Sequence, residues 1–356
     1  MGSVMYEAFL SEEGGLDWGS WLVGLVSAAE PRAAEPGVHR LLRALEGTTT
    51  GDGYRLARKV LGKTRHAAKS SGGVPNWLRH STAQPTGETA MLRDRYGSRT
   101  AVLVECAYPE EGSSGKTRLT ADRHVLLFDI DMCSHQEVVV DFGAFPDTEA
   151  AADHWRAAVG PSAAESTVVP AARELLAALV HDPNTPLDFW IGDEGRSVVA
   201  NCGRIRRRLA DLRTVLAKRG VDLRPAAGRY EVPEAEAITG DFLRWRAASG
   251  ADPASAAEAS GALWLIEDWC EGPLPMCRLT ASPHRVAVAL GSLADWKPGP
   301  ETTAARRLLS DWVRYVLEQS GVSGEFAAAS VRIAEGEPYP HLGPTGDVPL
   351  AGAVVE

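Results

Sequence analysis

Three aspartates follow two short apolar runs near the middle of the chain. Residues 125–128 are apolar and lead into Asp129-Ile130-Asp131, and a second run at 138–140 ends in Asp141. Side chains alternate along a strand, so Asp129 and Asp131 are expected on one face. If the two strands pair, all three carboxylates meet at one edge of the sheet, where they can hold Mg²⁺ or Mn²⁺. The alternative is that these aspartates only solvate a loop and cap the next turn.

Two histidines and a cysteine add acid–base and ligand chemistry to the same stretch. His124 opens the first strand, and Cys133 and His135 lie in the turn between the strands. A phosphohydrolase-like enzyme would use the three aspartates as metal ligands and His124 or His135 as the assisting acid or base. Cys133 and the histidines would also suit Zn²⁺, although no Cys-x-x-Cys or His-Glu-x-x-His spacing accompanies them. A Cys/His nucleophilic pair stays open, because such partners need not be close in sequence.

The segment 112–117, Gly-Ser-Ser-Gly-Lys-Thr, imitates a phosphate-binding loop. A complete loop needs glycine where this chain has Glu110, and a helix must begin at the lysine. Only about seven residues separate Thr117 from the next strand, too few for that helix and a crossover. We therefore interpret this segment as the tip of a hairpin.

Basic side chains cover one face of each of two predicted helices, at residues 54–69 and 196–219. The second helix has an apolar seam, and its far side carries five cations: Arg204, Arg207, Arg208, Lys218 and Arg219. If both basic faces lie on one side of the fold, they would bind a nucleic-acid backbone, a phosphorylated ligand or an acidic partner. Otherwise each is an ordinary solvated helix face.

Length and composition are those of a soluble globular protein. The chain has 356 residues, 44% hydrophobic and 24% charged, enough for about two domains. It lacks an apolar run of roughly 18 residues and a signal-peptide pattern, so no membrane association or export is expected. Five scattered cysteines indicate free thiols in a reducing cytoplasm. The net charge of −10 disfavours general adsorption to nucleic acid or anionic membranes.

Periodicity and capping residues place these features in an α+β fold. A strand at 101–108 is expected to form an antiparallel hairpin with the strand that begins at 124. Asp147 caps a helix at 148–159, and a further helix is predicted at 168–181. Before the sheet we expect helices, including a short one after Trp77. After a hinge at 224–228, the pattern predicts helices at 234–248, 255–269, 282–293 and 302–319, and a short strand at 326–333.

The predicted architecture is a small, mainly antiparallel sheet flanked by helices, with a helical N-terminal part and an all-helical C-terminal domain. The expected boundaries are 1–97 for the helical N-terminal part, 98–225 for the α+β central domain, 229–322 for the helical C-terminal domain and 323–356 for an irregular tail. The central stretch would be the hub on which both helical parts rest.

Several short motifs occur in an order that resembles a group of uncharacterised actinobacterial proteins. They are Val74-Pro75-Asn76-Trp77, Arg95-Tyr96-Gly97, the strand 124–129, and a Ser-Pro helix that runs from Ala281 to Asp295-Trp296-Lys297-Pro298. The likeness covers roughly residues 70–320 and implies a bacterial protein of one continuous design. In that group a Lys-Asp pair follows the strand, whereas this chain has Val140-Asp141. The departure argues against a shared catalytic lysine, and the resemblance brings no activity with it.

Two classes of function follow from the residues. The first is a binding or regulatory protein that uses its basic helix faces. The second is a divalent-metal enzyme built on Asp129, Asp131 and Asp141. The first is preferred, because no complete catalytic constellation is visible in the sequence.

Overall fold

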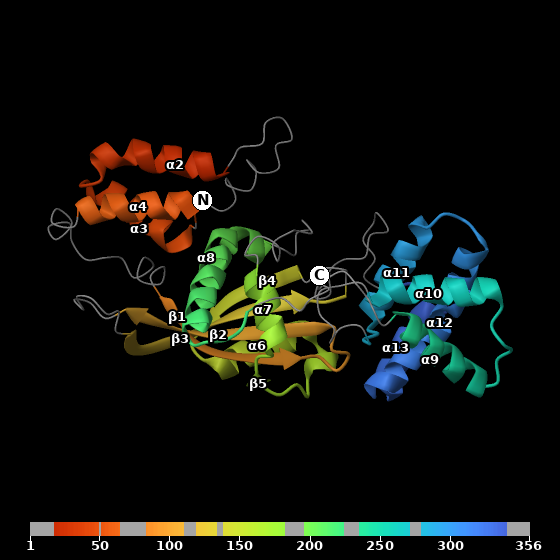
Figure 1. The fold of residues 1–356 in the computed structure, drawn as a ribbon. Helices are drawn as coiled ribbons and strands as arrows, with labels where there is room; N and C mark the ends of the chain where they lie inside the picture. The colour runs from red at the N-terminus through yellow and green to blue at the C-terminus, as the bar shows by residue number, and fades with distance from the viewer. Residues whose placement is uncertain are drawn as a thin grey trace.

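The structure is a computed structural model and describes residues 18–49, 51–64, 83–109, 119–133, 138–181, 196–223, 235–270 and 279–339. A central sheet with helices on both faces lies between an N-terminal and a C-terminal group of helices (Figure 1). The predicted α+β class, with its small antiparallel sheet and flanking helices, is confirmed. His135, the segment 112–117, the short helix expected after Trp77 and the hinge at 224–228 lie outside the described residues.

The sheet has five antiparallel strands in the order β4-β3-β2-β1-β5. Their bounds are Gln84–Arg93 (β1), Arg99–Pro109 (β2), Leu119–Asp131 (β3), Val138–Phe145 (β4) and Val169–Pro170 (β5). The predicted hairpin is confirmed as the β2–β3 pair, in which Leu103 lies opposite Leu127. β-Branched and aromatic residues fill both central strands and fit a pleated surface that is buried on both sides.

Two strands were not predicted from the sequence. β1 contains Pro85 and Gly87, and its register against β2 shifts between Pro85 and Thr89. These residues interrupt the strand signal, although a proline or glycine at a bulge is compatible with a sheet. As a result the sheet begins before the boundary expected at residue 98. β5 is a two-residue strand that pairs with β1, and the helix predicted at 168–181 begins only at Arg173.

Helices cover both faces of the sheet. α6 (Thr148–Val159) packs on one face, and α7 (Arg173–His181) and α8 (Arg196–Lys218) pack on the other. As predicted, the Asp147 carboxylate caps α6 by accepting a hydrogen bond of 2.8 Å from Ala150 N. The predicted seam of α8 is also confirmed over its described side chains. Its buried residues are Ile205, Leu209, Leu212 and Leu216.

The N-terminal helices form a layer with a core of their own. They are α2 (Trp18–Ala29), α3 (Pro36–Thr48) and α4 (Gly51–Lys63), with a 3₁₀ turn at Glu30–Arg32 between α2 and α3. Apolar side chains from all three helices meet between them. This layer contacts the rest of the described chain through α8, which lies beneath it in Figure 1.

The C-terminal group is helical throughout its described residues. Its helices are α9 (Ala235–Ala248), α10 (Ala256–Cys270), α11 (Pro283–Asp295), α12 (Pro300–Ser320) and α13 (Gly324–Ala334). The strand predicted at 326–333 is wrong, because this alanine-rich stretch forms α13 and places Ile333 in the core. The predicted start of α11 is confirmed, with Ser282 as the cap and Pro283 first. No described helix is both long and apolar enough to cross a membrane.

Two glycines in this group provide a matched test of the packing. A Cβ added at Gly261 of α10 would lie 2.5 Å from the Glu301 carbonyl oxygen of α12, whereas one added at Gly291 of α11 would meet nothing within 4 Å. We expect Gly261→Ala to lower the free energy of unfolding by about 1–3 kcal/mol through overpacking. Gly291→Ala should raise it by about 0.5–1 kcal/mol through helix propensity. Urea unfolding measures both, and equal effects would contradict this account of the α10–α12 contact.

Candidate metal centre

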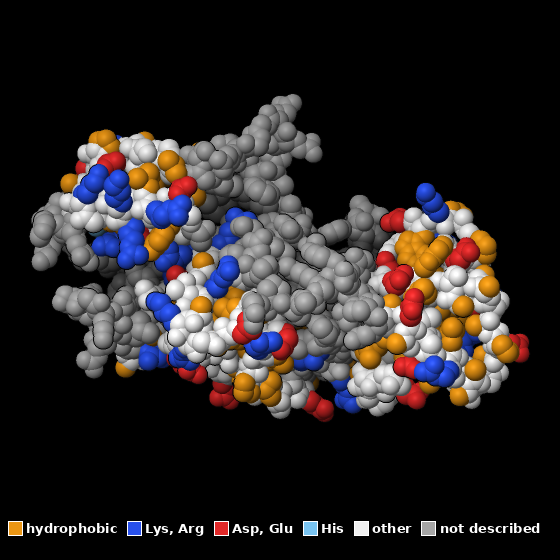
Figure 2. Space-filling view, in the orientation of Figure 1, with side chains coloured by type: hydrophobic (Ala, Val, Ile, Leu, Met, Phe, Trp, Pro, Cys, Tyr) orange, Lys and Arg blue, Asp and Glu red, His pale blue; other side chains and the backbone are white. Residues whose placement is uncertain are grey.

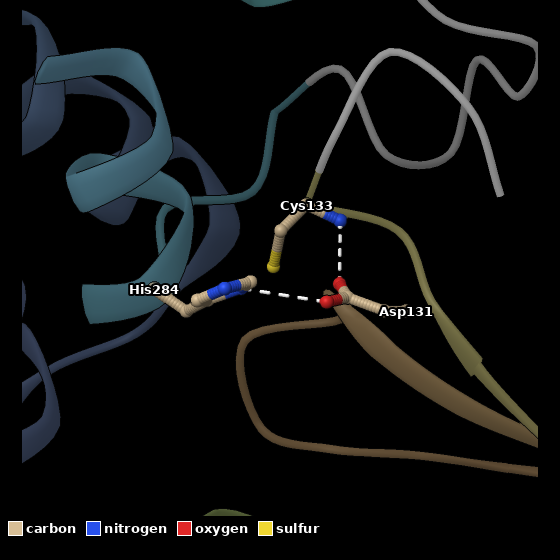
Figure 3. Close-up of side chains that lie close together, drawn as sticks. All are labelled: Asp131, Cys133 and His284. Atoms are coloured by element: carbon tan, nitrogen blue, oxygen red, sulfur yellow. Dashed lines mark hydrogen bonds and ion pairs between the residues drawn. The ribbon is translucent and has the colours of Figure 1, made fainter. Parts of the chain in front are cut away.

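The end of β3 meets the first turn of α11, and three potential metal ligands face one another there (Figure 3). Asp131 is the last residue of β3, and Cys133 follows two positions later. His284 is the second residue of α11. The Ser282 hydroxyl fixes this turn by accepting a hydrogen bond of 3.2 Å from Arg285 N. A strand end and a capped helix start therefore position the three side chains.

The donor atoms of Asp131, Cys133 and His284 all lie within 4.8 Å of one another. Oδ2 of Asp131 is 3.5 Å from Nδ1 of His284, and Oδ1 accepts a hydrogen bond of 2.8 Å from the backbone N–H of Cys133. Tetrahedral Zn²⁺ with such ligands needs donor separations of about 3.3–3.8 Å. Small side-chain movements of about 1 Å would therefore complete a site with three protein ligands.

The His284 ring is buried without hydrogen bonds. Its relative exposure is 5%, and among the described residues neither ring nitrogen has a hydrogen-bond partner. The 3.5 Å approach of Nδ1 to Asp131 is an ionic contact rather than a hydrogen bond. A buried polar group without a hydrogen bond costs about 1–3 kcal/mol. The imidazole therefore has capacity for a further ligand at the point where a thiol and a carboxylate are close.

Charges around the cluster act in opposite directions on its two acidic groups. Burial alone would raise the pKa of Asp131, but the nearby positive charges of His284 and Arg99 and the Cys133 N–H outweigh it and leave the pKa lowered. Burial, with the Asp131 charge second, raises the pKa of the Cys133 thiol well above its usual range. Without a metal the cluster is thus a carboxylate beside a neutral thiol. A bound metal ion would displace the thiol proton, because metal coordination requires a thiolate.

Unlike Asp131, Asp129 forms a buried ion pair with Arg99. Both of its oxygens accept hydrogen bonds from Arg99, at 2.7 and 2.6 Å, and Oδ1 also accepts one of 2.9 Å from the Trp155 indole of α6. Burial alone would lower the pKa of Arg99, but the negative charge of Asp129 raises it, so the guanidinium stays charged. Both oxygens of the Asp129 carboxylate therefore accept hydrogen bonds from within the sheet, and one also accepts a bond from α6.

The predicted metal set of Asp129, Asp131 and Asp141 is not assembled. Asp141 lies opposite Asp129 in the β3–β4 register, but its carboxylate is half-exposed, 3.5 Å from Nε2 of His154. In the part of the chain that the structure describes, no group of three close donors includes Asp129 or Asp141. The register places Asp129 and Asp141 opposite each other, but Arg99 bonds both oxygens of Asp129 and His154 lies beside Asp141, so their carboxylates are not gathered with that of Asp131.

The predicted histidine His124 does not belong to this cluster. His124 lies opposite Cys106 in the β2–β3 register, and its ring packs against Tyr108 at 5.3 Å. Asp129 faces α6, whereas Cys106 faces the core beneath α7 and α8, so His124 cannot assist the carboxylates from there. His135 lies outside the described residues. Among the described residues, the histidine beside Cys133 is His284.

The predicted anion-binding residues in and just after α8 differ in burial and in their ion-pair partners. Arg208 is buried and Arg207 is half-buried, and both pair with Asp211. Arg219 pairs with Glu88 of β1 at 2.8 Å. Arg204 is half-buried and Lys218 is exposed. The interpretation of this set as one exposed basic face is therefore corrected, because Arg207 and Arg208 face the N-terminal helices.

Sequence reasoning did not select His284. The residue stands in the stretch Ala281–Val286 that was noted for its Ser-Pro helix start, which is a structural signal rather than a chemical one. Its ligand partners precede it by about 150 residues, so no metal-ligand spacing was available to reveal the site. Arg99 and Trp155 lie 30 and 26 residues from Asp129, and no local pattern in the sequence indicated that they would be its partners.

Comparison of the chain with protein-family models, with curated proteins and with solved structures finds no match.

The Arg99–Asp129 pair should dominate the stability of this region. Asp129→Asn would leave the Arg99 charge buried without its counter-ion, and we expect it to lower the free energy of unfolding by about 3–5 kcal/mol. Trp155→Phe removes one hydrogen bond to the carboxylate and part of a fully buried ring, and it should cost about 1.5–3 kcal/mol. Chemical unfolding of both variants tests this order, and the reverse order would contradict a dominant ion pair.

The Asp94 carboxyl group, in the turn before Arg99, should make the free energy of unfolding depend on pH. Its carboxylate accepts hydrogen bonds from the backbone N–H groups of Ser98 and Arg99, but burial raises its pKa from an ordinary 3.8 to about 6. Because the pKa of Asp94 is higher in the folded state than in the unfolded state, its protonated carboxyl group adds to the free energy of unfolding. This contribution is full below about pH 4 and is lost as the pH rises through 6. The change is worth about 3 kcal/mol.

Unfolding free energies measured between pH 4 and 7 on the wild type and Asp94→Asn test this assignment. The wild-type value minus the variant value should fall as the pH rises, because asparagine keeps an acceptor oxygen but cannot ionise. A difference that is constant across this range would show that Asp94 titrates normally.

Proposed function

We propose that this protein binds Zn²⁺ through Asp131, Cys133 and His284, and that the ion fastens the C-terminal helices to the central sheet. The observation that carries the proposal is the buried His284 imidazole, which has no hydrogen-bond partner in the described part of the chain and lies beside a thiol and a carboxylate. Coordination would give one ring nitrogen a bond and so offset the cost of burying it.

The donor atoms favour zinc over the Mg²⁺ or Mn²⁺ considered for the three aspartates. Magnesium and manganese prefer sets of oxygen ligands, whereas thiolate and imidazole suit zinc. The thiolate of Cys133 and the carboxylate of Asp131 would supply two negative charges that balance the ion. Three protein donors leave one tetrahedral position for a fourth ligand.

The position of the site couples metal binding to folding. Asp131 ends β3 and Cys133 follows it, whereas His284 belongs to α11, far away in the sequence. The same interface holds a hydrogen bond of 3.0 Å from the Tyr96 hydroxyl to the Phe326 carbonyl oxygen. An ion bound across it would add its binding free energy to the stability of the interface. This supports a non-enzymatic protein with a structural metal.

The same three residue types also occur in nucleophilic enzymes, as thiol, base and orienting acid. The contact of Asp131 with Nδ1 of His284 favours this second reading. A nucleophilic cysteine, however, needs a lowered pKa and an approach for its substrate. Burial and the Asp131 charge instead raise the pKa of the Cys133 thiol, and all three side chains are buried. The metal site therefore accounts for more of the geometry.

Titration of the chelator-treated full chain with Zn²⁺, and with Co²⁺ as a spectroscopic probe, tests the proposal. We expect one equivalent to bind, with a thiolate-to-cobalt charge-transfer band and a raised thermal midpoint. At free Zn²⁺ about 100-fold above Kd, the gain is about 2.7 kcal/mol. Cys133→Ser and His284→Gln should lose the band and most of the thermal shift, whereas Mg²⁺ should have no effect on the wild type.

Cys106→Ser is the matched control, because Cys106 is also a buried free cysteine but lies in the core beneath α8. This variant should lose stability without losing the metal response. Full Zn²⁺ binding by Cys133→Ser and His284→Gln, or none by the wild type, would overturn the proposal. Rapid alkylation of Cys133 that His284→Gln abolishes would favour the nucleophile instead.

A further inference from the structure

Positive charge is concentrated on two parts of the chain that pack together. Residues 18–64 contain seven basic and four acidic side chains, and α8 contains seven basic and one acidic. These parts therefore carry net charges of +3 and +6, although the whole chain carries −10. Such segregation leaves the rest of the protein strongly acidic, and a charge distribution of this kind favours an anionic partner at the basic end.

The N-terminal helices dock on α8 mainly through the end of α3, and Tyr54 of α4 reaches the same contact, so cations of α4 and α8 come close there. A Cβ added at Gly203 of α8 would lie 2.7 Å from the Thr48 carbonyl oxygen at the end of α3. The guanidinium of Arg207 lies 3.9 Å from the ring centroid of Tyr54 in α4. From the other side, Arg58 of α4 donates a hydrogen bond of 2.6 Å to the Tyr54 hydroxyl. Cations from both helices thus meet around one tyrosine.

The acidic groups in this seam do not balance its cations. Asp211 is the single acidic residue of α8 and accepts hydrogen bonds from both Arg207 and Arg208. Burial lowers the pKa of Arg208 and outweighs the negative charge of Asp211, which raises it. The charges of Arg207 and Arg204 lower it further. The crowding of like charges leaves the seam with a net positive charge that an external anion would stabilise.

The outer part of this region is exposed. The side chains of Arg58 and Lys59 are exposed on α4, and Lys218 is exposed near the end of α8. Figure 2 shows Lys and Arg side chains over the N-terminal helices and in the region just beneath them. On the same view, acidic side chains are more frequent over the C-terminal helices. A partner therefore meets the positive charge on the surface and not only in the core.

We propose that the α4–α8 seam binds the sugar–phosphate backbone of a nucleic acid without reading its sequence. Arginines supply eleven of the fourteen basic residues in the two parts, and the guanidinium fork matches phosphate oxygens. With 13 and 23 residues, the two helices are about 20 and 35 Å long. A charged surface of that length fits a polymer of phosphates better than a single phosphate group. This inference does not depend on the zinc site.

Fluorescence anisotropy of the full chain with short labelled single-stranded and duplex oligonucleotides, at several salt concentrations, tests the proposal. We expect binding that weakens as salt increases and varies little with base sequence. The charge-reversed variant Arg58→Glu/Lys59→Glu changes exposed residues but removes the exposed Arg58–Tyr54 hydrogen bond, so its melting curve should lie close to that of the wild type. Its slope of log K against log salt should be smaller in magnitude by about 2, one for each lost phosphate contact.

Arg244→Glu/Arg307→Glu is the matched control, because it reverses two exposed cations of the C-terminal helices. It should bind like the wild type. The inference is overturned if the wild type does not bind at low salt, or if both double variants lose binding equally. It is also overturned if polyglutamate displaces the oligonucleotide as well as an unlabelled oligonucleotide does, because the seam would then recognise an acidic protein.

Discussion

Burial of negative charge at the end of β3 is the constraint on which the rest of this structure depends. Asp129 and Asp131 are each only 1% exposed, and an ionised carboxylate in such surroundings is costly unless it is paired and hydrogen-bonded. Arg99 at the start of β2 and Trp155 of α6 satisfy Asp129. Asp131 instead meets His284, which belongs to the C-terminal helices. The need to pair one carboxylate therefore links two parts of the molecule.

The surroundings of Asp129 and Asp131 differ in how fully they satisfy the buried polar groups. The Arg99–Asp129 pair is bidentate, and the carboxylate accepts an additional hydrogen bond from an indole. The cluster of Asp131, Cys133 and His284 leaves the imidazole without hydrogen bonds, although it is equally enclosed. A buried polar network that is only partly satisfied costs more than one that is complete. This difference is the physical reason to assign stability to the first arrangement and ligand binding to the second.

At the contact with the N-terminal helices, buried positive charge likewise has to be paired and hydrogen-bonded. Arg208 is buried against the end of α3, where it donates to the Gly47 carbonyl oxygen at 3.3 Å, and it pairs with Asp211. Cations are favourable at a helix C-terminus because the last carbonyls lack partners within the helix. Two arginines of α8 thus hold the N-terminal helices in place, while exposed cations such as Arg58 and Lys59 remain for a partner. The N-terminal helices are thus joined to the sheet through α8, whereas the C-terminal helices meet it at the end of β3.

Local patterns in the sequence were enough to predict much of the fold. The apolar run at 125–128, the seam of α8, and the caps at Asp147 and Ser282 all form as expected, because periodicity and capping act over a few residues. Tertiary structure decided the rest. It paired β1 into the sheet in spite of Pro85, and it chose the partners of each buried charge from residues far away in the chain. Carboxylate positions were therefore predictable from sequence, but their partners depended on how the layers pack.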